Sequence, residues 1–423
     1  MSKKTASWSR LDNAAKIFPP TSTEKDTKVF RFACELYEEV RPDRLQAALD
    51  TTLAYFPGFR SVLKRGLFWY YLEGSDLAAQ VKEEDAPPCG VLYDRNVKTL
   101  LFEVTYYGRR INVEVYHALA DGNGALEFLK TLVYHYLLLA HPEAFPQPPV
   151  MDYDASDRQR MDDSFARYYS AQKTAKRPTV KAYRLRGARL PEHRLRIIEG
   201  VTPTAALLAC ARERGVTLTV LLAALLIFSI RGEMTVRDCK RPVVLAVPVN
   251  LRKYFHSESA RNFFSVIQVG YDFAAYSGEF EDVLARLKAA FQEELTEEQL
   301  QSRMDAYSAL EYNVFARATP LILKDLFMRI AHDLSEKETT VSLSNLGRIA
   351  MPPEMRSYIR LFDVFNSTPR LQLCLCSYEE HTTLTFSSTF VSTDVQRRFF
   401  RALSALGLPV EVTASPVGEE EEA

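Results

Sequence analysis

The stretch Tyr116-His117-Ala118-Leu119-Ala120-Asp121-Gly122 joins a predicted strand to a predicted helix and decides how the first half of the chain folds. Before it, apolar side chains alternate with polar ones, as in a half-buried strand. The alternating apolar residues are Ile111, Val113 and Val115. After it, apolar residues recur at helical spacing until Pro142, where the helix must end because proline has no backbone N–H to donate. The pattern predicts a strand, a histidine at its end, and an aspartate where the helix begins.

His117 and Asp121 allow two interpretations on these grounds. An imidazole at a strand end can point into a cleft, and its near-neutral pKa suits it to accept a proton from a hydroxyl or an amine. The alternative is structural: Asp121 caps the helix, and His117 is an ordinary strand-end residue bonded to backbone. A short pattern of this kind also arises by chance, so other segments must decide between the two.

Three other segments occur in the order and spacing of a known superfamily. They are Arg10–Phe18, Val247–Arg252 followed by Arg261–Phe264, and Ser342–Gly347. Together with His117-x-x-x-Asp121-Gly122, they resemble the signatures of the superfamily of chloramphenicol acetyltransferases, plant BAHD acyltransferases, wax ester synthases and nonribosomal peptide condensation domains. Within this superfamily the chain most resembles the bacterial alcohol acetyltransferase-like proteins. The resemblance spans nearly the whole chain.

The chain also departs from two branches of that superfamily. Condensation domains usually carry two adjacent histidines, whereas Tyr116 precedes the single histidine here. The Asp-Phe-Gly-Trp-Gly motif of the plant enzymes is absent from the sequence. Both departures argue against a peptide condensation domain and against a plant-type enzyme.

The resemblance implies an α/β fold, with α+β two-layer sandwiches arranged as two chloramphenicol-acetyltransferase-like subdomains. The active site then lies in a tunnel between them, open at both faces. We expect residues 1–145 to form the N-terminal subdomain, 146–181 a linker, and 182–415 the C-terminal subdomain. A strand near 341–347 is expected to bridge the two, and the acidic tail 416–423 is expected to be disordered.

The resemblance also assigns roles within the motif. His117 is implied as the general base, and Asp121 is implied to hold the loop through a structural ion pair, for which Arg252 is the expected partner. Gly122 lets the backbone pass close to the substrate, and its N–H is a candidate donor to the developing oxyanion. The structural alternatives are a surface arginine after a strand and a helix-start glycine.

Other residues are candidates for substrate contact, each with a structural alternative. Asn262 and Asn345 either line the tunnel or serve as turn or capping residues. Tyr116 either narrows the pocket or packs in the core. Nine lysines and arginines lie between Lys173 and Arg196, where they either engage the phosphates of coenzyme A or are simply solvated.

Length and composition bound the possible classes of protein. A chain of 423 residues is long enough for two ordinary domains, and 47% apolar with 25% charged residues is typical of a soluble globular protein. A net charge of −1 gives no reason to expect nucleic acid as a partner.

No apolar run follows the first residues, so no secretory signal is expected. The longest apolar stretch, Val216–Ile230, is too short to span a bilayer comfortably and predicts a buried core helix rather than a transmembrane segment.

Cysteines and histidines give no metal pattern. The six cysteines have no Cys-x-x-Cys spacing, and the seven histidines are scattered. We therefore expect a reduced, cytoplasmic protein without a metal.

The leading functional hypothesis is an O-acyltransferase that transfers acetyl from acetyl-CoA to an alcohol by direct general-base catalysis. No Gly-x-Ser-x-Gly segment supplies a serine nucleophile, which favours a ternary complex over a covalent acyl-enzyme. One alternative is an enzyme that takes a carrier-protein thioester or uses an amine acceptor. Another is a non-catalytic binding module with the same fold.

Overall fold

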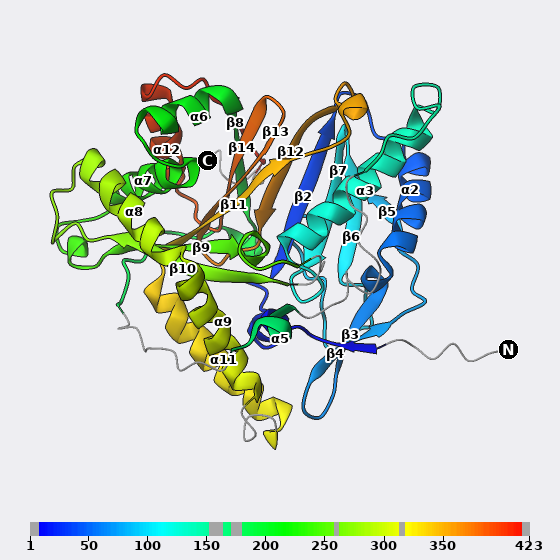
Figure 1. Cartoon of the computed structure of the whole chain (residues 1–423), viewed down its shortest axis with the longest axis horizontal. Helices are drawn as coiled ribbons and strands as arrows, with labels where there is room; N and C mark the ends of the chain where they lie inside the picture. Colours follow the sequence, from blue (N-terminus) through cyan, green and yellow to red (C-terminus); the bar gives the residue numbers. More distant parts are fainter. Residues whose placement is uncertain (1–7, 152–163, 171–179, 258–261, 313–317, 417–423) are drawn as a thin grey trace.

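The computed structural model describes residues 8–151, 164–170, 180–257, 262–312 and 318–416. Two large sheets stand side by side, each with helices packed against it (Figure 1). This mixed arrangement of two sheet-rich halves confirms the predicted fold class. The predictions for Arg261, for much of the linker and for the tail after residue 416 fall outside the described residues.

The N-terminal half is built on a five-stranded sheet with strand order β12-β2-β7-β6-β5. Its strands are β2 (Val29–Leu36), β5 (Val81–Glu83), β6 (Phe102–Tyr107), β7 (Arg110–Tyr116) and β12 (Ile359–Asn366). Helices α2 (Pro42–Tyr55) and α3 (Gly122–Ala140) pack against each other and share a core with the sheet. A small sheet extends this half with β1 (Trp8–Arg10), β3 (Ser61–Arg65) and β4 (Tyr70–Gly74).

The C-terminal half is built on a seven-stranded sheet with strand order β10-β9-β11-β13-β14-β8-β15. Its strands are β8 (Arg196–Pro203), β9 (Val243–Asn250), β10 (Phe264–Tyr271), β11 (Val341–Ile349), β13 (Leu371–Tyr378), β14 (His381–Ser388) and β15 (Glu411–Ala414). Its helices are α6 (Thr204–Glu213), α7 (Leu218–Arg231), α8 (Phe280–Glu294) and α12 (Asp394–Ala405). As its continuous apolar run predicts, α7 is buried on nearly every side, and the side chain of Thr217 caps its first turn.

Within the described residues, four more α-helices lie outside these two layers. They are α1 (Phe18–Thr21), α5 (Ser164–Tyr168), α9 (Glu297–Tyr312) and α11 (Leu321–Ser335). The last three gather at the lower end of the molecule in Figure 1. Neither α9 nor α11 was predicted from the sequence. Helix α9 has almost no apolar stripe at helical spacing, whereas α11 has one, and it was overlooked.

The expected bridging strand needs a correction. The segment 341–347 forms most of β11, which pairs with β9 and β13 inside the C-terminal sheet. The strand that crosses to the other half is β12, which runs antiparallel to β2 and places Phe362 opposite Cys34. The N-terminal half therefore includes a strand from the range assigned to the C-terminal subdomain. Sequence spacing did not reveal this, because strand pairing between distant segments is set by tertiary contacts.

Buried charges join the two halves where β7 meets β8. Both terminal nitrogens of Arg110 lie 2.9 Å from the carboxylate oxygens of Glu199, and the Nε of Arg110 lies 2.8 Å from Glu35. Arg360 donates to the other oxygen of Glu35 at 2.7 Å. Burial raises the pKa of the neighbouring Asp363 to about 7, and the negative charge of Glu199 adds to this effect. Asp363 is thus a buried acid that keeps its proton up to a much higher pH than an aspartate in water.

Among the described residues, no single helix has the length and apolar character needed to cross a membrane. Helices α6 and α7 reach that length and composition only when taken together, across a bend of 83°.

Candidate active site

His117 leaves the end of β7 and lies among aromatic side chains. Its backbone N–H donates to the carbonyl of Lys28 at 2.9 Å, which continues the pairing of β7 with β2 for one more residue. The imidazole stacks on Phe18 with ring centroids 4.4 Å apart and an interplanar angle of 17°. Phe30 and Phe264 approach it at 4.8 and 5.6 Å. The ring is therefore held by packing before any substrate arrives.

A hydrogen-bond network behind His117 fixes which nitrogen carries the proton. The side-chain nitrogen of Asn262 faces two acceptors, the carboxylate of Asp12 at 3.2 Å and the carbonyl of His117 at 3.1 Å. The side-chain oxygen of Asn262 is therefore the atom that lies 3.2 Å from Nδ1 of His117. Because that oxygen can only accept, Nδ1 carries the proton in the neutral ring and Nε2 keeps a free lone pair.

The surroundings keep the imidazole neutral. Burial lowers the pKa of His117 below its usual value, and the negative charge of Asp121 and the hydrogen bond to Asn262 oppose this effect only in part. Among the described residues, Asn262 is the one side chain given a hydrogen bond to the ring, and it lies at Nδ1 and not at Nε2. The site thus presents a neutral imidazole with an available lone pair, which is the form a general base requires.

Asp121 acts as both a helix cap and an ion-pair partner. One carboxylate oxygen accepts from the N–H of Gly124 at 2.9 Å, so Asp121 is the N-cap of α3. The other oxygen lies 2.7 Å from the guanidinium of Arg252 and 2.9 Å from the N–H of Phe263. The implied ion pair with Arg252 is present, and it joins the start of α3 to the segment after β9. Because the carboxylate bonds in directions away from Nδ1, it does not orient the imidazole by direct contact.

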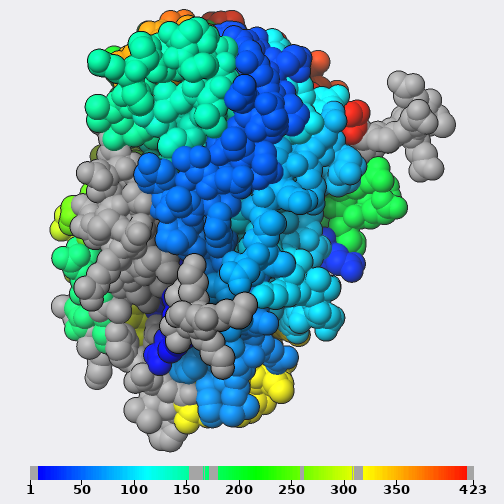
Figure 2. Space-filling model, turned by 90° about the vertical axis from the view of Figure 1, so that its right-hand side faces the viewer, coloured from blue at the N-terminus to red at the C-terminus, as the bar shows by residue number. Residues whose placement is uncertain are grey.

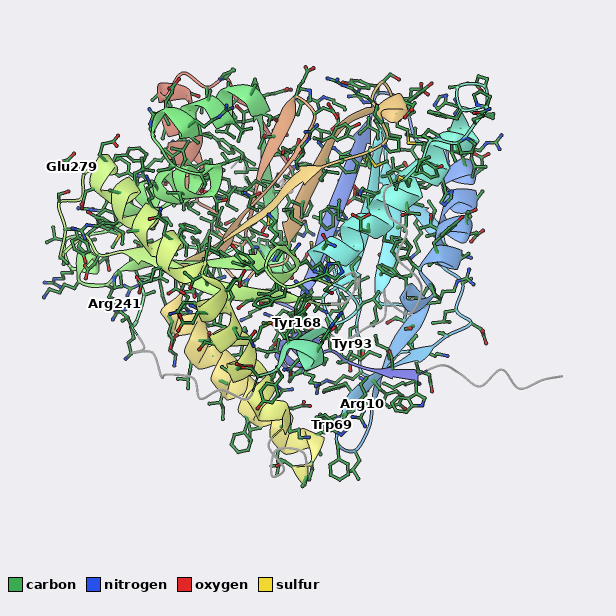
Figure 3. The ribbon with its side chains drawn as sticks, viewed as in Figure 1. Arg10, Trp69, Tyr93, Tyr168, Arg241 and Glu279 are labelled. Atoms are coloured by element: carbon green, nitrogen blue, oxygen red, sulfur yellow. The ribbon has the colours of Figure 1, made fainter. Side chains whose placement is uncertain are left out.

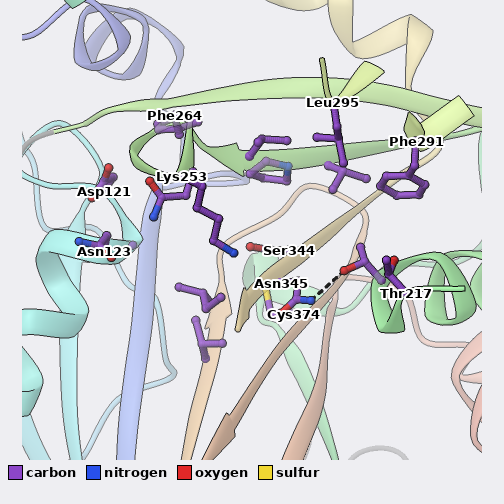
Figure 4. Close-up of a pocket in the computed structure, with 18 of the residues that line it drawn as sticks. Asp121, Asn123, Thr217, Lys253, Phe264, Phe291, Leu295, Ser344, Asn345 and Cys374 are labelled. Atoms are coloured by element: carbon purple, nitrogen blue, oxygen red, sulfur yellow. Dashed lines mark hydrogen bonds between the residues drawn. The ribbon is translucent and has the colours of Figure 1, made fainter. Parts of the chain in front are cut away.

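A cavity of about 850 Å³ opens in front of His117 and runs between the two halves of the molecule. Near the histidine it is lined by residues of the motif and by apolar side chains of both halves: Phe30, Phe32, Asp121, Gly122, Leu126, Phe264, Leu346 and Val364. Figure 4 shows Asp121 and Asn123 at one end, and Phe291 and Leu295 at the other. A space of this size is typical of a site for a small molecule or cofactor.

The far end of the cavity carries positive charge. Arg212 and Lys288 line the cavity, Lys288 from the same helix as Phe291, and Thr217 lies at this end just before α7 (Figure 4). The side chain of Lys253 extends into the cavity toward Ser344 (Figure 4). The basic residues predicted between Lys173 and Arg196 are not among the lining residues in the part of that stretch the structure describes, from residue 180 onward. These three cations were missed because they come from three separate segments of the chain.

Three polar side chains form a hydrogen-bonded group in the cavity wall. Asn366 donates to Gln372 at 2.9 Å, and the thiol of Cys374 donates to Asn366 at 3.3 Å. All three line the cavity, at the ends of β12 and β13 nearest to it. The wall near His117 thus combines apolar and amide surface.

The predicted contact residues have different outcomes. Asn345 lines the cavity, donates to Thr219 at 2.8 Å and accepts from the N–H of Gly347 at 2.8 Å. Asn262 does not line the cavity, since it lies behind His117 as its hydrogen-bond partner. Tyr116 does not line it either. Its side chain is fully buried, and its hydroxyl lies 2.9 Å from Ser22, because successive strand side chains point to opposite faces.

Gly122 lines the cavity. A Cβ atom at this position would meet the side chain of Leu346 at 3.1 Å. Asp12 is a site residue that sequence reasoning missed, although it falls within the Arg10–Phe18 segment that carries the resemblance. Among the described residues, no group of three or more potential ligands is arranged to hold a metal ion.

Comparison with known proteins gives similarity in structure only. No protein-family model matches the sequence, and no curated protein matches it either. Many solved structures are similar to the chain, and three that match over nearly its whole length have TM-scores from 0.60 to 0.65. TRI101 from F. graminearum in complex with ethyl coenzyme A has a TM-score of 0.65 and 10% identity, and the match covers 96% of this chain and 100% of that one.

The other two represent related classes of protein. TRI3 trichothecene 15-O-acetyltransferase from Fusarium sporotrichioides has a TM-score of 0.61 and 11% identity, covering 96% of each chain. A variant of the starter condensation domain of rhizomide synthetase RzmA, in complex with C8-CoA, has a TM-score of 0.60 and 14% identity, covering 95% of each chain. The chain therefore has the same fold as TRI101, the TRI3 acetyltransferase and the RzmA condensation domain, which is the fold that the sequence motifs implied.

Proposed function

We propose that this protein is a coenzyme A-dependent O-acyltransferase that transfers acetyl from acetyl-CoA to an alcohol. The observation that carries the proposal is the state of His117, a neutral ring whose Nδ1 proton is held by Asn262 while Nε2 remains available beside the cavity. The sequence resemblance to alcohol acetyltransferase-like proteins supports the choice of acetyl donor and alcohol acceptor. The acetyltransferase and the coenzyme A complexes among the similar structures support the same class of reaction.

The reaction proceeds in one ternary complex. The acceptor hydroxyl donates its proton to Nε2 of His117 as its oxygen attacks the thioester carbonyl carbon. The C–O bond forms and the carbonyl oxygen becomes an oxyanion. The C–S bond then breaks, and the proton on Nε2 passes to the departing thiolate, which leaves as coenzyme A thiol. A positioned base of this kind contributes a factor of roughly 10² to 10⁴ in rate.

The start of α3 is suited to stabilise the oxyanion. The N–H of Gly122 belongs to the first turn of α3, where backbone N–H groups have no acceptor within the helix. The positive end of the dipole of α3 lies at this same turn, where it also favours a negative charge. Asp121 and Arg252 hold this turn in place without contacting the reacting atoms.

Positive charge at the far end of the cavity favours a nucleotide-bearing donor. Arg212 and Lys288 line that end, Lys253 extends into the same cavity nearer to Asp121, and the phosphates of coenzyme A are anionic. A cavity of about 850 Å³ connects these cations with His117. In this arrangement the pantetheine arm extends along the cavity toward His117. The alcohol then occupies the region lined by Phe30, Val364 and the amide group of Asn366.

The test is thiol release from acetyl-CoA against a panel of alcohols and amines, with His117→Ala in parallel. We expect release that depends on an alcohol and that falls by at least about 10² in the variant. Lys337→Ala, an exposed residue outside the cavity, is the matched control and should keep full activity.

Other outcomes separate the competing functions. Release that survives His117→Ala removes His117 as the base. Release only with amines replaces the alcohol as acceptor. Turnover with an acetylated carrier protein but not with acetyl-CoA favours a carrier-dependent enzyme. Binding of coenzyme A with no turnover of any donor favours a non-catalytic module.

A further inference from the structure

Helix α11 exposes a largely apolar face. Six large apolar side chains of this helix are each between 47% and 70% exposed. They are Ile322, Leu323, Leu326, Phe327, Ile330 and Leu334. At about 100° per residue they fall within a sector of roughly 140° on one side of the helix. Within the part of the chain that the structure describes, nothing covers this sector.

The opposite face of α11 is anchored to the N-terminal half. Tyr70 donates to Asp325 at 2.8 Å, and Arg65 lies 3.8 Å from the same carboxylate. Arg329 donates to the backbone carbonyl of Pro20 at 2.7 Å, where α11 packs against α1. The outward direction of the apolar face is therefore fixed by buried polar contacts on the inner side of the helix.

The tip of the β3–β4 hairpin extends the apolar face. Leu67 is 73% exposed, Phe68 is also exposed, and the carbonyl of Leu67 accepts the N–H at the start of α11 at 3.0 Å. The hairpin tip and α11 both reach the lower end of the molecule in Figure 1, and their blue and yellow atoms share the lower edge in Figure 2. We call these eight exposed side chains together the α11 surface.

Basic and aromatic groups border the α11 surface. The ammonium of Lys324 lies 3.6 Å from the ring centroid of Trp69, and that of Lys16 lies 5.6 Å from it. Trp69 sits at the same lower end of the molecule (Figure 3). Arg65 and Arg329 add two more positive charges. Of the two acids of α11, Asp325 is buried and bonded, and Asp333 is exposed within the apolar sector, so basic groups outnumber acids around this face.

We propose that the α11 surface docks the protein onto an anionic lipid bilayer. An amphipathic helix with large apolar residues on one side, bordered by lysine, arginine and tryptophan, matches the pattern of helices that lie in the membrane interface. The positive border complements the negative surface of anionic lipids. The apolar side chains form an outward-facing ridge, which a fluid bilayer accepts without a preformed complementary groove.

Docking brings the bilayer close to the candidate active site. The inner face of α11 packs on α1, and α1 begins with Phe18, whose ring stacks on His117. One helix thus separates the α11 surface from the imidazole. The proposal concerns binding alone and does not depend on the acyl transfer proposed above.

The test is co-sedimentation of the full chain with vesicles of phosphatidylcholine, alone or with about 30% phosphatidylglycerol. We expect binding to the anionic vesicles, weakened by salt, and at least about a 10-fold loss of affinity in the double variant Phe327→Glu/Ile330→Glu. The matched control is Val150→Glu/Val236→Glu, which adds the same charge at two positions that are each 87% exposed and lie outside the α11 surface.

Three results would overturn the proposal. The first is the absence of wild-type binding to anionic vesicles. The second is an equal loss of binding in the control, which would reduce the effect to net charge. The third is a wild-type dimer in sedimentation velocity that Phe327→Glu/Ile330→Glu converts to a monomer, which would make this face a contact between two copies of the chain.

Discussion

Replacing Asn262 with leucine isolates the role of the hydrogen bond behind His117. The variant removes the acceptor 3.2 Å from Nδ1 and the donor to Asp12 and to the carbonyl of His117, while it keeps a side chain of similar size. The carboxylate of Asp12 still receives the backbone N–H groups of Ala15 and of position 262. We therefore expect the fold to persist, with a loss of about 2 kcal/mol in the free energy of unfolding.

The effect on catalysis follows from the charge that His117 acquires. When Nε2 takes the proton, the bond from Nδ1 to Asn262 becomes a hydrogen bond from a cation, which contributes about 1.5 to 3 kcal/mol. Its loss should lower kcat by about 10-fold to about 150-fold. KM should change little, because Asn262 does not line the cavity.

The pH profile gives a second readout that a general loss of stability would not produce. Burial holds the pKa of His117 below its usual value, and the hydrogen bond to Asn262 raises it. Without that bond the pKa falls further, so the imidazole stays neutral at lower pH. The acidic limb of kcat should therefore move to lower pH even though the maximum rate falls.

The assay is thiol release measured from about pH 5 to about pH 9, with urea unfolding on the same samples. Asn13→Leu is the matched control, since Asn13 bonds to Ser308 at 3.3 Å and does not line the cavity. The reasoning fails if kcat of Asn262→Leu changes less than about threefold, or if its acidic limb moves to higher pH.

Three other perturbations have defined outcomes. Arg252→Met leaves the buried charge of Asp121 with only backbone donors, so the free energy of unfolding in urea should fall by about 3 kcal/mol. A loss below about 1 kcal/mol would show that the ion pair does not stabilise the fold. Gly122→Ala places a Cβ 3.1 Å from Leu346, and kcat should fall at least about 10-fold with little change in stability. If adding Leu346→Ala restores kcat in full, the loss comes from that steric clash and not from a lost oxyanion donor. The pKa of Asp363 is raised to about 7, so the native state binds a proton that the unfolded state, with a pKa of about 3.9, has lost. The stability that protonated Asp363 contributes is lost as the pH rises toward and through 7. Asp363→Asn should therefore unfold at a higher urea concentration than the wild type at about pH 8, and this difference should shrink toward about pH 4. A difference that does not depend on pH would contradict this reasoning.

Local signals in the sequence predicted the central segment well. Alternation up to Val115 indicated β7, the apolar spacing after Gly122 indicated α3, and Asp121 was expected where the helix begins. The apolar run of Val216–Ile230 indicated the buried helix α7 in the same way. These features depend on periodicity and on capping within a few residues, and such information is present in any short window of the chain.

The sequence also led to wrong or missing assignments where distant segments meet. It placed the bridging strand near 341–347, whereas β12 pairs with β2. It offered the basic stretch Lys173 to Arg196 as a candidate for phosphate binding, with simple solvation as the alternative, and it did not identify Lys253, which lines the cavity. Neither feature has a local signature, because each arises from contacts between residues far apart in the chain.

The sequence by itself determined that this protein has a histidine at a strand end, an aspartate that caps the next helix, and the pattern of a two-half acyltransferase-like fold. Only the tertiary structure decided what those residues do together. Asp12 and Asn262 are 250 positions apart, yet their bonds fix the proton on His117. Likewise, α11 has apolar residues on both faces, and only its anchoring through Asp325 decides which face is buried. Periodicity specifies an element, whereas the partner of each face depends on how the whole chain packs.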